Sequence, residues 1–187
     1  KGPGDAIALG IGMVHQHFML VPVLSVVENV ILGLPTGKTP VLDLASATEK
    51  LAALAGQTGL AVDPGARVWQ LPVGVQQRVE ILKFLYRGAD ILILDEPTAV
   101  LTPDEITRFF AVLKQLQTQG VTVILITHKL KEVMAVSDRV TVMRAGRAVA
   151  TLNTCDTTPA ALARLMVGRE VMFQVEKTGA APREPRL

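Results

Sequence analysis

The segment from residue 89 to residue 128 places the strongest constraint on the fold, because it carries a strand, a helix and a second strand with marked boundaries. ADILILDEP (89–97) is a short apolar run, and VTVILITH (121–128) is a second run rich in β-branched residues. Both patterns are typical of buried strands. Between them, the capping box Thr102-Pro103-Asp104-Glu105 predicts a helix start, and Gly120 can end that helix. This order indicates an α/β fold with parallel pairing.

Other segments predict a small helical layer and a C-terminal hairpin followed by a helix. Residues 41–60 are rich in alanine and have helical spacing of apolar positions. DRVTVMRAGRAVATL (138–152) predicts a hairpin that turns at Ala145-Gly146, and Thr158-Pro159 predicts the start of a helix that reaches Gly168.

The composition excludes several classes of protein. With 49% hydrophobic residues and a net charge of +2 over 187 residues, the chain is not disordered and can bury a sizeable core. The charge balance gives no reason to expect a nucleic-acid partner, because phosphate binding needs clustered excess cations. The single cysteine, Cys155, cannot form an intrachain disulfide and suits a reducing cytoplasm.

One stretch resembles a transmembrane segment in its length and lack of charge. Residues 6–27 contain no formal charge and approach the ~20 residues that a bilayer core requires. His15-Gln16-His17 lies in the middle of this stretch, where three polar side chains are costly to bury in lipid. We therefore expect a strand and a loop here rather than a transmembrane helix.

Two acids follow the first of the buried strands. Asp95 and Glu96 come at the carboxyl end of ILILDEP, the edge where α/β sheets bind ligands. Nucleotide chemistry needs such a pair, because one acid can hold a magnesium ion while the other orients the attacking water. A strand that merely ends in a solvated acidic turn is the alternative.

The segment after Gly74 predicts a helix with one apolar face. Four apolar residues recur at i, i+4, i+7 and i+11, namely Val75, Val79, Leu82 and Tyr86. By this pattern Gln77 and Glu80 lie off the buried face. The exposed N–H groups at the start of such a helix form a ready anion site.

Residues 71–105, LPVGVQQRVEILKFLYRGADILILDEPTAVLTPDE, resemble the block of ABC ATPases that runs from the signature motif to Walker B. In that family a Leu-Ser-x-Gly-x-Gln segment opens a helix leading to the Walker B strand, and here Leu71 to Gln76 stand in its place. Gln16 in MVHQHF is similar to the Q-loop glutamine, and His128 in LITHK to the switch histidine. EPTAVLTPDE and residues 12–33 resemble more closely the ATPases of simple-sugar and nucleoside importers.

The resemblance implies a role for each of these residues. Asp95 and Gln16 would hold Mg²⁺, Glu96 would polarise the hydrolytic water, and Gln16 and His128 would contact the γ-phosphate of ATP. Gly74 and Gln76 would approach the ATP of a second nucleotide-binding domain across a dimer interface.

The resemblance also implies a function and partners. The expected protein is an ATP-hydrolysing subunit that energises import of a nucleoside or monosaccharide from the cytoplasmic face of the membrane. Its expected partners are transmembrane permease subunits, a second nucleotide-binding domain and, indirectly, a periplasmic or lipoprotein solute-binding protein, without nucleic acid. A non-catalytic remnant that acts as an interaction module is the alternative.

The chain departs from the family pattern at two places. It has no G-x-x-x-x-G-K-[ST] motif, since Gly33 to Thr39 has its glycines too close together and is followed by Pro40, and we interpret it as a turn. Pro72 stands where the family has the signature serine.

We therefore expect a partial nucleotide-binding domain over 1–177, incomplete as an ABC-type P-loop NTPase. Within it, a helical subdomain spans about 24–88, and a linker or tail follows over 178–187. By itself this chain is expected to bind ATP very weakly and not to hydrolyse it.

Overall fold

A computed structural model describes residues 2–34 and 43–168 of the chain. The chain divides into two compact units, residues 1–128 and residues 129–187, and each is described by itself. The expected tail over 178–187 and most of the turn between Gly33 and Thr39 lie outside the described residues. The domain limits of 1–177 and 24–88 stay predictions.

A three-stranded parallel sheet forms the centre of the first unit. Its strands are β1 (Ile11–Val14), β2 (Ile91–Asp95) and β3 (Thr122–Ile126), in the order β1-β2-β3. Val14 pairs with Leu94, and Leu94 pairs with Leu125, so the three strands end at nearly the same level. The predicted strands and their parallel pairing are confirmed, and their carboxyl ends share one edge. The expectation that both later strands are buried was wrong for β3, which is an edge strand of the described sheet and leaves Ile124 and Ile126 47% and 46% exposed.

The helix between β2 and β3 begins as its capping box predicts. Helix α5 (Pro103–Thr118) has Thr102 as its N-cap, and the Thr102 side chain accepts a hydrogen bond from the backbone N–H of Glu105. The Glu105 carboxylate in turn accepts from the backbone N–H of Thr102 at 2.9 Å. After the helix the chain reverses at Gly120, whose φ of +92° is a conformation that glycine adopts without strain.

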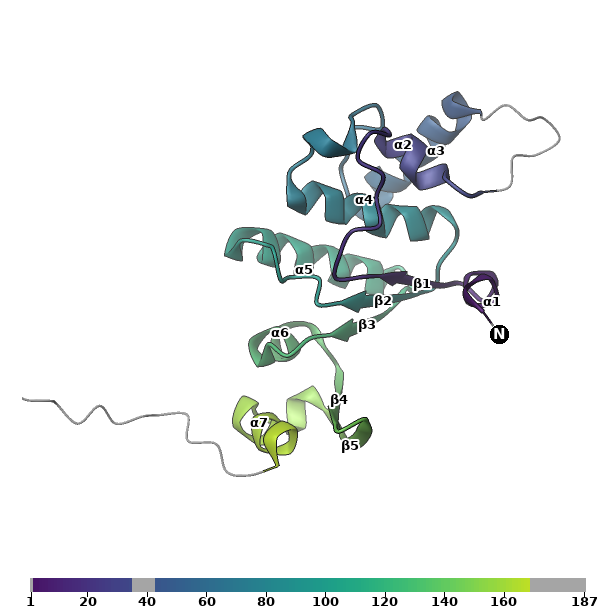
Figure 1. Cartoon of the computed structure of the whole chain (residues 1–187). Coiled ribbons are helices and arrows are strands. Elements are labelled where there is room, and N and C mark those ends of the chain that lie inside the picture. Colours follow the sequence, from purple (N-terminus) through teal and green to yellow (C-terminus); the bar gives the residue numbers. More distant parts are fainter. Residues whose placement is uncertain (1, 35–42, 169–187) are drawn as a thin grey trace, which may run out of the picture. The chain divides into compact units, whose positions relative to one another are not determined.

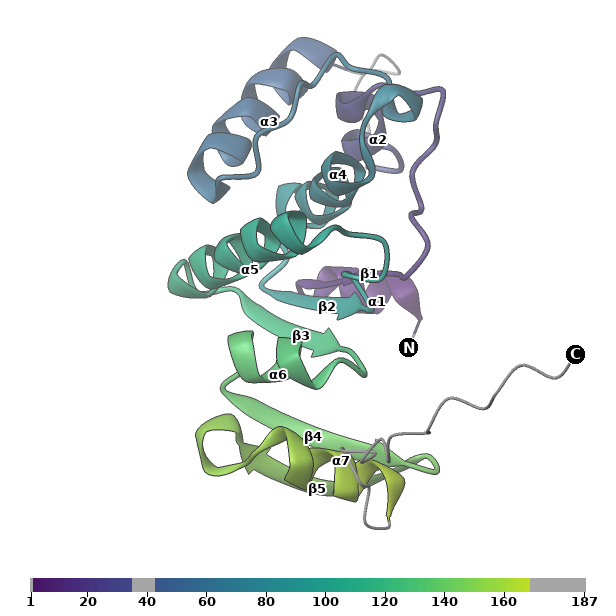
Figure 2. The ribbon, with the colours of Figure 1, turned by 90° about the vertical axis from the view of Figure 1, so that its left-hand side faces the viewer.

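Helices α2 to α5 of the first unit lie in layers on one face of the sheet (Figures 1 and 2). Helix α4 (Val73–Tyr86) and α5 cover the sheet, while α2 (Val26–Ile31) and α3 (Leu44–Thr58) lie beyond α4 (Figures 1 and 2). At Gly12 of β1 the helix comes very close, because a Cβ there would lie 2.7 Å from the Phe84 side chain. A glycine therefore lets α4 pack directly against β1, and α3 confirms the helix predicted within 41–60.

Helix α4 corrects one expectation from the hydrophobic pattern. Val79 and Leu82 are fully buried as predicted, but Gln77 and Glu80 are buried as well, each only 2% exposed. The pattern was wrong about these two residues because it assigns polar side chains to solvent. Both have polar backbone partners inside the unit, which the local sequence does not show.

Residues 6–27, which resemble a transmembrane segment in sequence, form several short elements. It contains the end of α1 (Pro3–Ala8), strand β1, a loop and the beginning of α2. Helix α1 was not predicted. Among residues 2–34 and 43–168, no helix has the length and apolar character needed to cross a bilayer.

The second unit contains a hairpin and short helices. Its elements are α6 (Leu130–Val136), β4 (Arg139–Arg144), β5 (Arg147–Asn153), a 3-10 turn (Thr154–Asp156) and α7 (Pro159–Val167). Ala145 and Gly146 have φ values of 48° and 74°, as expected for a two-residue hairpin turn. The Thr158 hydroxyl caps α7 and Gly168 ends it, so the predicted hairpin and helix are confirmed.

Acidification is expected to weaken the two capping boxes of the first unit. The Ser25 backbone and hydroxyl bond to Glu28 and hold its pKa below the ordinary value of 4.5, and Thr102 does the same for Glu105. An acid whose pKa is lowered by folding stabilises the protein above its unfolded pKa and loses this effect at lower pH. The Tm advantage of the wild type over Glu28→Gln/Glu105→Gln should therefore shrink from about pH 6 to pH 3.

Thermal melting followed by circular dichroism measures this difference. Glu49→Gln removes one negative charge, against two in the double variant, from an exposed position of α3 outside a capping box, and is the control. A wild-type advantage that stays constant down to the lowest pH would contradict the prediction.

Candidate functional site

The carboxyl edge of the sheet gathers residues from three distant parts of the chain. Gln16 lies in the bend two residues after Val14, and Glu96 lies two residues after Leu94, the sheet partner of Val14. His128 follows β3, whose Ile126 is paired with Asp95. Loops at this edge form the ligand sites of parallel α/β sheets, so the expected catalytic residues lie where such a site forms.

Glu96 and His128 are in direct contact. The Nδ1 atom of His128 lies 2.9 Å from Oε1 of Glu96, although the two residues are 32 positions apart in the sequence. When Glu96 is ionised, its carboxylate only accepts hydrogen bonds, so Nδ1–H donates and Nε2 is left for another partner. The side chains are 66% and 32% exposed, so this pair contributes little to stability and is accessible to a ligand.

The backbone of Glu96 is strained. Its φ is +44°, in the left-handed region that costs a non-glycine residue about 1 kcal/mol or more. Its N–H donates to the Ile126 carbonyl at 2.9 Å, and the carbonyl of the next residue, Pro97, accepts from Gln77 Nε2 at 2.7 Å. Hydrogen bonds on both sides therefore hold the turn that points this carboxylate toward His128.

Asp95 and Gln16 lie at the same edge with different exposure. Asp95 is half-buried as the last residue of β2, whereas Gln16 is exposed. Within the described parts of the chain, no group of three or more His, Cys, Asp or Glu residues is arranged to hold a metal ion. A magnesium ion at this edge would therefore take most of its ligands from phosphate oxygens and water, as Mg²⁺ commonly does.

Gly74 and Gln76 lie at the start of α4, and their described contacts are with residues other than Glu96 and His128. Gln76 Nε2 donates to the Leu71 carbonyl at 2.9 Å. A Cβ on Gly74 would lie 2.7 Å from the Glu105 carboxylate, so the first turns of α4 and α5 are close together. Pro72 is the N-cap of α4 and provides no side-chain acceptor for it.

Buried polar side chains of α4 and α2 hold the loop that follows Gln16. Glu80 Oε1 accepts from the backbone N–H of Met19 at 2.6 Å, and Glu80 Oε2 lies 3.2 Å from Lys83 Nζ. Asn29, only 2% exposed, bonds to both the N–H and the carbonyl of Val21. The sequence analysis missed these residues. For Glu80, the available signal was a polar side chain between two apolar neighbours, Val79 and Ile81.

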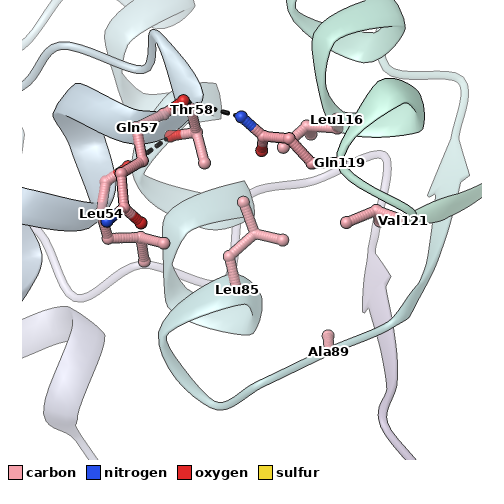
Figure 3. A pocket seen from close by; sticks show the side chains of 8 residues that line it. All are labelled: Leu54, Gln57, Thr58, Leu85, Ala89, Leu116, Gln119 and Val121. Carbon is pink, nitrogen blue, oxygen red and sulfur yellow. Dashed lines mark hydrogen bonds between the residues drawn. The ribbon is translucent and has the colours of Figure 1, made fainter.

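A pocket of about 510 Å³ lies at the opposite edge of the sheet (Figure 3). Ala89 and Val121, which precede β2 and β3, line it, and Gln119 Nε2 donates to the Gln57 carbonyl at 2.8 Å beside it. None of the predicted site residues lines this pocket. It is therefore separate from the candidate site.

Comparison with known proteins identifies the family. The family model described as "ABC transporter" matches residues 5–99, which include Gln16, Gly74 and Gln76 together with Asp95 and Glu96. The chain belongs to the ABC transporter family. Membership implies that the intact domain binds a nucleotide.

Curated relatives cover nearly the whole of this ABC transporter chain. A nucleoside import ATP-binding protein, NupA of Lactococcus lactis, is 54% identical over 97% of the chain and 36% of its own length. The guanosine import ATP-binding protein NupO of Bacillus subtilis is 53% identical over 97% and 36%. A glucose import ATP-binding protein of Haloferax volcanii is 49% identical over 99% and 39%. The chain thus spans little more than a third of the length of these relatives.

Solved structures confirm the fold. The ADP conformation of MJ1267, an ATP-binding cassette of an ABC transporter, matches with a TM-score of 0.70 at 21% identity, over 88% of this chain and 67% of that one. CbiO1 of Clostridium perfringens, described as part of an ABC transporter complex, matches with a TM-score of 0.68 at 27% identity, over 83% and 62%. The α/β architecture is that of an ABC cassette, and this chain corresponds to about two thirds of each.

Removal of Glu80 is expected to destabilise this chain strongly. Glu80→Ala would leave Lys83, whose side chain is only 14% exposed, without its carboxylate and the Met19 N–H without an acceptor. Breaking a buried ion pair in this way costs about 3 kcal/mol or more of unfolding free energy. Urea denaturation of the 187-residue chain measures this loss.

The double variant Glu80→Met/Lys83→Met separates charge from packing. It keeps two long apolar side chains and leaves no buried charge, so it should recover much of the stability that Glu80→Ala loses. A Glu80→Ala chain as stable as the wild type would show that the buried pair does not hold this loop.

Proposed function

We propose that the chain is part of an ATP-hydrolysing subunit that energises import of a small solute. The observation that carries this proposal is the contact between Glu96 and His128 at the carboxyl edge of a parallel sheet. Both side chains are accessible. The carboxylate can act as a general base, and the imidazole beside it can form a hydrogen bond with a bound phosphate. The names of the curated relatives support import as the process that hydrolysis drives.

Each site residue has a proposed role. Glu96 accepts a hydrogen bond from the attacking water and orients it toward the γ-phosphate of ATP. His128 holds the Glu96 carboxylate through Nδ1 and contacts the γ-phosphate through Nε2. Gln16 contacts the same phosphate from the end of β1, and the start of α4 at Gly74 and Gln76 approaches the nucleotide of a second domain.

The donor set at this edge is compatible with magnesium. Asp95 and Gln16 supply hard oxygen ligands, and one or two such ligands suffice when phosphate oxygens and water complete the shell. Bound Mg²⁺ would neutralise charge on the transferring phosphoryl group. Asp95 precedes the strained Glu96 directly, so the same strand end positions the metal ligand and the base.

The proposed solute is a nucleoside or a monosaccharide, with the nucleoside favoured by the two relatives at 54% and 53% identity. Transmembrane permease subunits are the proposed direct partners, together with a second nucleotide-binding domain. A solute-binding protein on the outer side would act indirectly. The chain would then work at the cytoplasmic face of the membrane. The names of the relatives give no support to a non-catalytic interaction module.

A chimera tests the proposed function. This chain replaces the matching 182-residue segment of the Lactococcus nucleoside import protein, and nucleoside uptake is measured in a Lactococcus strain that lacks the original gene. We expect uptake to be restored and Glu96→Gln to abolish it, because an amide cannot accept the proton of the attacking water. The MgATP turnover of the purified chimera should fall about 100-fold or more in this variant.

Glu49→Gln on the exposed side of α3 is the matched control and should leave both uptake and turnover unchanged. Turnover that survives Glu96→Gln in a chimera that folds and binds ATP would exclude Glu96 as the base. A chimera with normal turnover and no uptake would exclude nucleoside import.

Replacement of Pro72 gives a second prediction. Proline has neither a hydroxyl nor an N–H, so a serine at this position adds a donor beside the start of α4. Pro72→Ser is expected to raise the ATP turnover of the chimera, because this part of α4 is proposed to face the nucleotide of the second domain. An unchanged rate would show that Pro72 does not limit the site.

A further inference from the structure

Gln77 connects helix α4 to the peptide that follows the proposed base. Its side chain is 2% exposed, and its Nε2 donates to the Pro97 carbonyl at 2.7 Å. Pro97 comes directly after Glu96, and the two bonded residues are 20 positions apart in the sequence. A buried amide is costly unless it is hydrogen-bonded, so the bond to Pro97 explains how a polar residue is tolerated in this position.

This bond is one of two that enclose the strained turn. On one side, the Glu96 N–H donates to the Ile126 carbonyl at 2.9 Å, and on the other side Gln77 fixes the orientation of the Pro97 carbonyl. The φ of +44° at Glu96 is not a conformation that a glutamate adopts readily without such restraints. If the Gln77 bond is lost, the turn can relax and the carboxylate can leave its position beside His128.

We propose that Gln77 is a positioning residue that sets the place of the Glu96 carboxylate through the Pro97 carbonyl. The proposal rests on the proposed function for the claim that this place matters to ATP hydrolysis. The claim about position does not depend on it, because that claim concerns only hydrogen bonds within this chain. Gln77 itself touches neither substrate nor metal in this scheme.

The donor character of the Gln77 side chain is the decisive property. Methionine at this position has a similar length and packs as an apolar side chain, but it leaves the Pro97 carbonyl without its donor. Glutamate has the same shape as glutamine, but in its ionised form it only accepts hydrogen bonds. The neutral form of glutamate can donate its O–H, and lowering the pH raises the population of this form.

The first experiment uses the 187-residue chain and needs no activity. The chain contains three histidines, so the ring signals of His128 can be assigned in an NMR spectrum by single His→Asn variants. At one fixed pH near neutrality, Gln77→Met and Gln77→Glu should move the His128 ring signals toward their position in Glu96→Gln. The signals of His15 and His17 should stay in place.

Gln115→Met is the matched control. Gln115 Nε2 also donates to a backbone carbonyl, that of Gln57 at 3.0 Å, but at the opposite end of α5 from its first turn. This variant also loses a bond from a side-chain amide to a backbone carbonyl, here at an exposed position, and should leave the His128 signals unchanged. His128 signals that do not respond to Gln77→Met in a folded chain would overturn the proposal.

The second experiment measures ATP hydrolysis by the import chimera. Gln77→Met should lower kcat about 10-fold to 100-fold, the size expected when a catalytic group is misplaced, with the KM for ATP changed less than about twofold. The activity of Gln77→Glu relative to the wild type should rise as the pH is lowered, because the neutral carboxyl restores a donor to Pro97. The relative activity of Gln77→Met should not depend on pH.

The two experiments distinguish the possible failures. A wild-type chimera without ATPase activity would contradict the proposed function, while the NMR comparison would still decide whether Gln77 positions Glu96. Gln77 variants with normal kcat, or with only a raised KM, would contradict the positioning role in hydrolysis. If Gln77→Met fails to fold, Gln77→Glu at the fixed pH near neutrality provides the NMR comparison, and the pH dependence of its activity relative to the wild type provides the kinetic one.

Discussion

The in-register parallel pairing of β1, β2 and β3 decides where the candidate catalytic groups lie. Parallel strands that end at one level place the residues after them at a common edge, so Gln16, Glu96 and His128 gather there from distant parts of the chain. A shift of one residue in either pairing would turn the side chains to the other face and move this edge. The chemistry of the site thus depends on the sheet register before it depends on any side-chain contact.

Helix α4, on one face of the sheet, holds the backbone that follows β1 and β2. It approaches β1 closely at Gly12, and its buried polar residues Gln77 and Glu80 bond to the backbone after β2 and after β1, respectively. These bonds do not increase the hydrophobic core, and an apolar residue in either place would bury as much surface. What the polar residues add is a fixed direction for two loops, since a hydrogen bond restricts geometry more than apolar contact does.

Local signals explain which parts of the fold could be predicted. The capping box at Thr102, the turn at Ala145-Gly146 and the apolar runs of β2 and β3 each depend on residues close together in the sequence, and the structure confirms them. Gln77 and Glu80 were placed wrongly because their partners lie 20 and 61 residues away. Of the candidate site residues, Asp95 and Glu96 were predicted from their place after a strand, and Gln16 and His128 from motif resemblance. The strain at Glu96 and its contact with His128 required the structure.

The turn at Glu96 also limits when the site can form during synthesis. One of its restraints comes from Gln77, which precedes it, whereas Ile126 and His128 come later, the histidine by 32 residues. At the usual rate of synthesis these residues are added about 2–6 seconds after Glu96. The segments of β2 and α4 are therefore synthesised before β3 is available to pair. In that interval the nascent chain contains Asp95 and Glu96 but lacks the backbone hydrogen bond from Glu96 to Ile126. The contact between Glu96 and His128 is therefore acquired only when β3 pairs with β2.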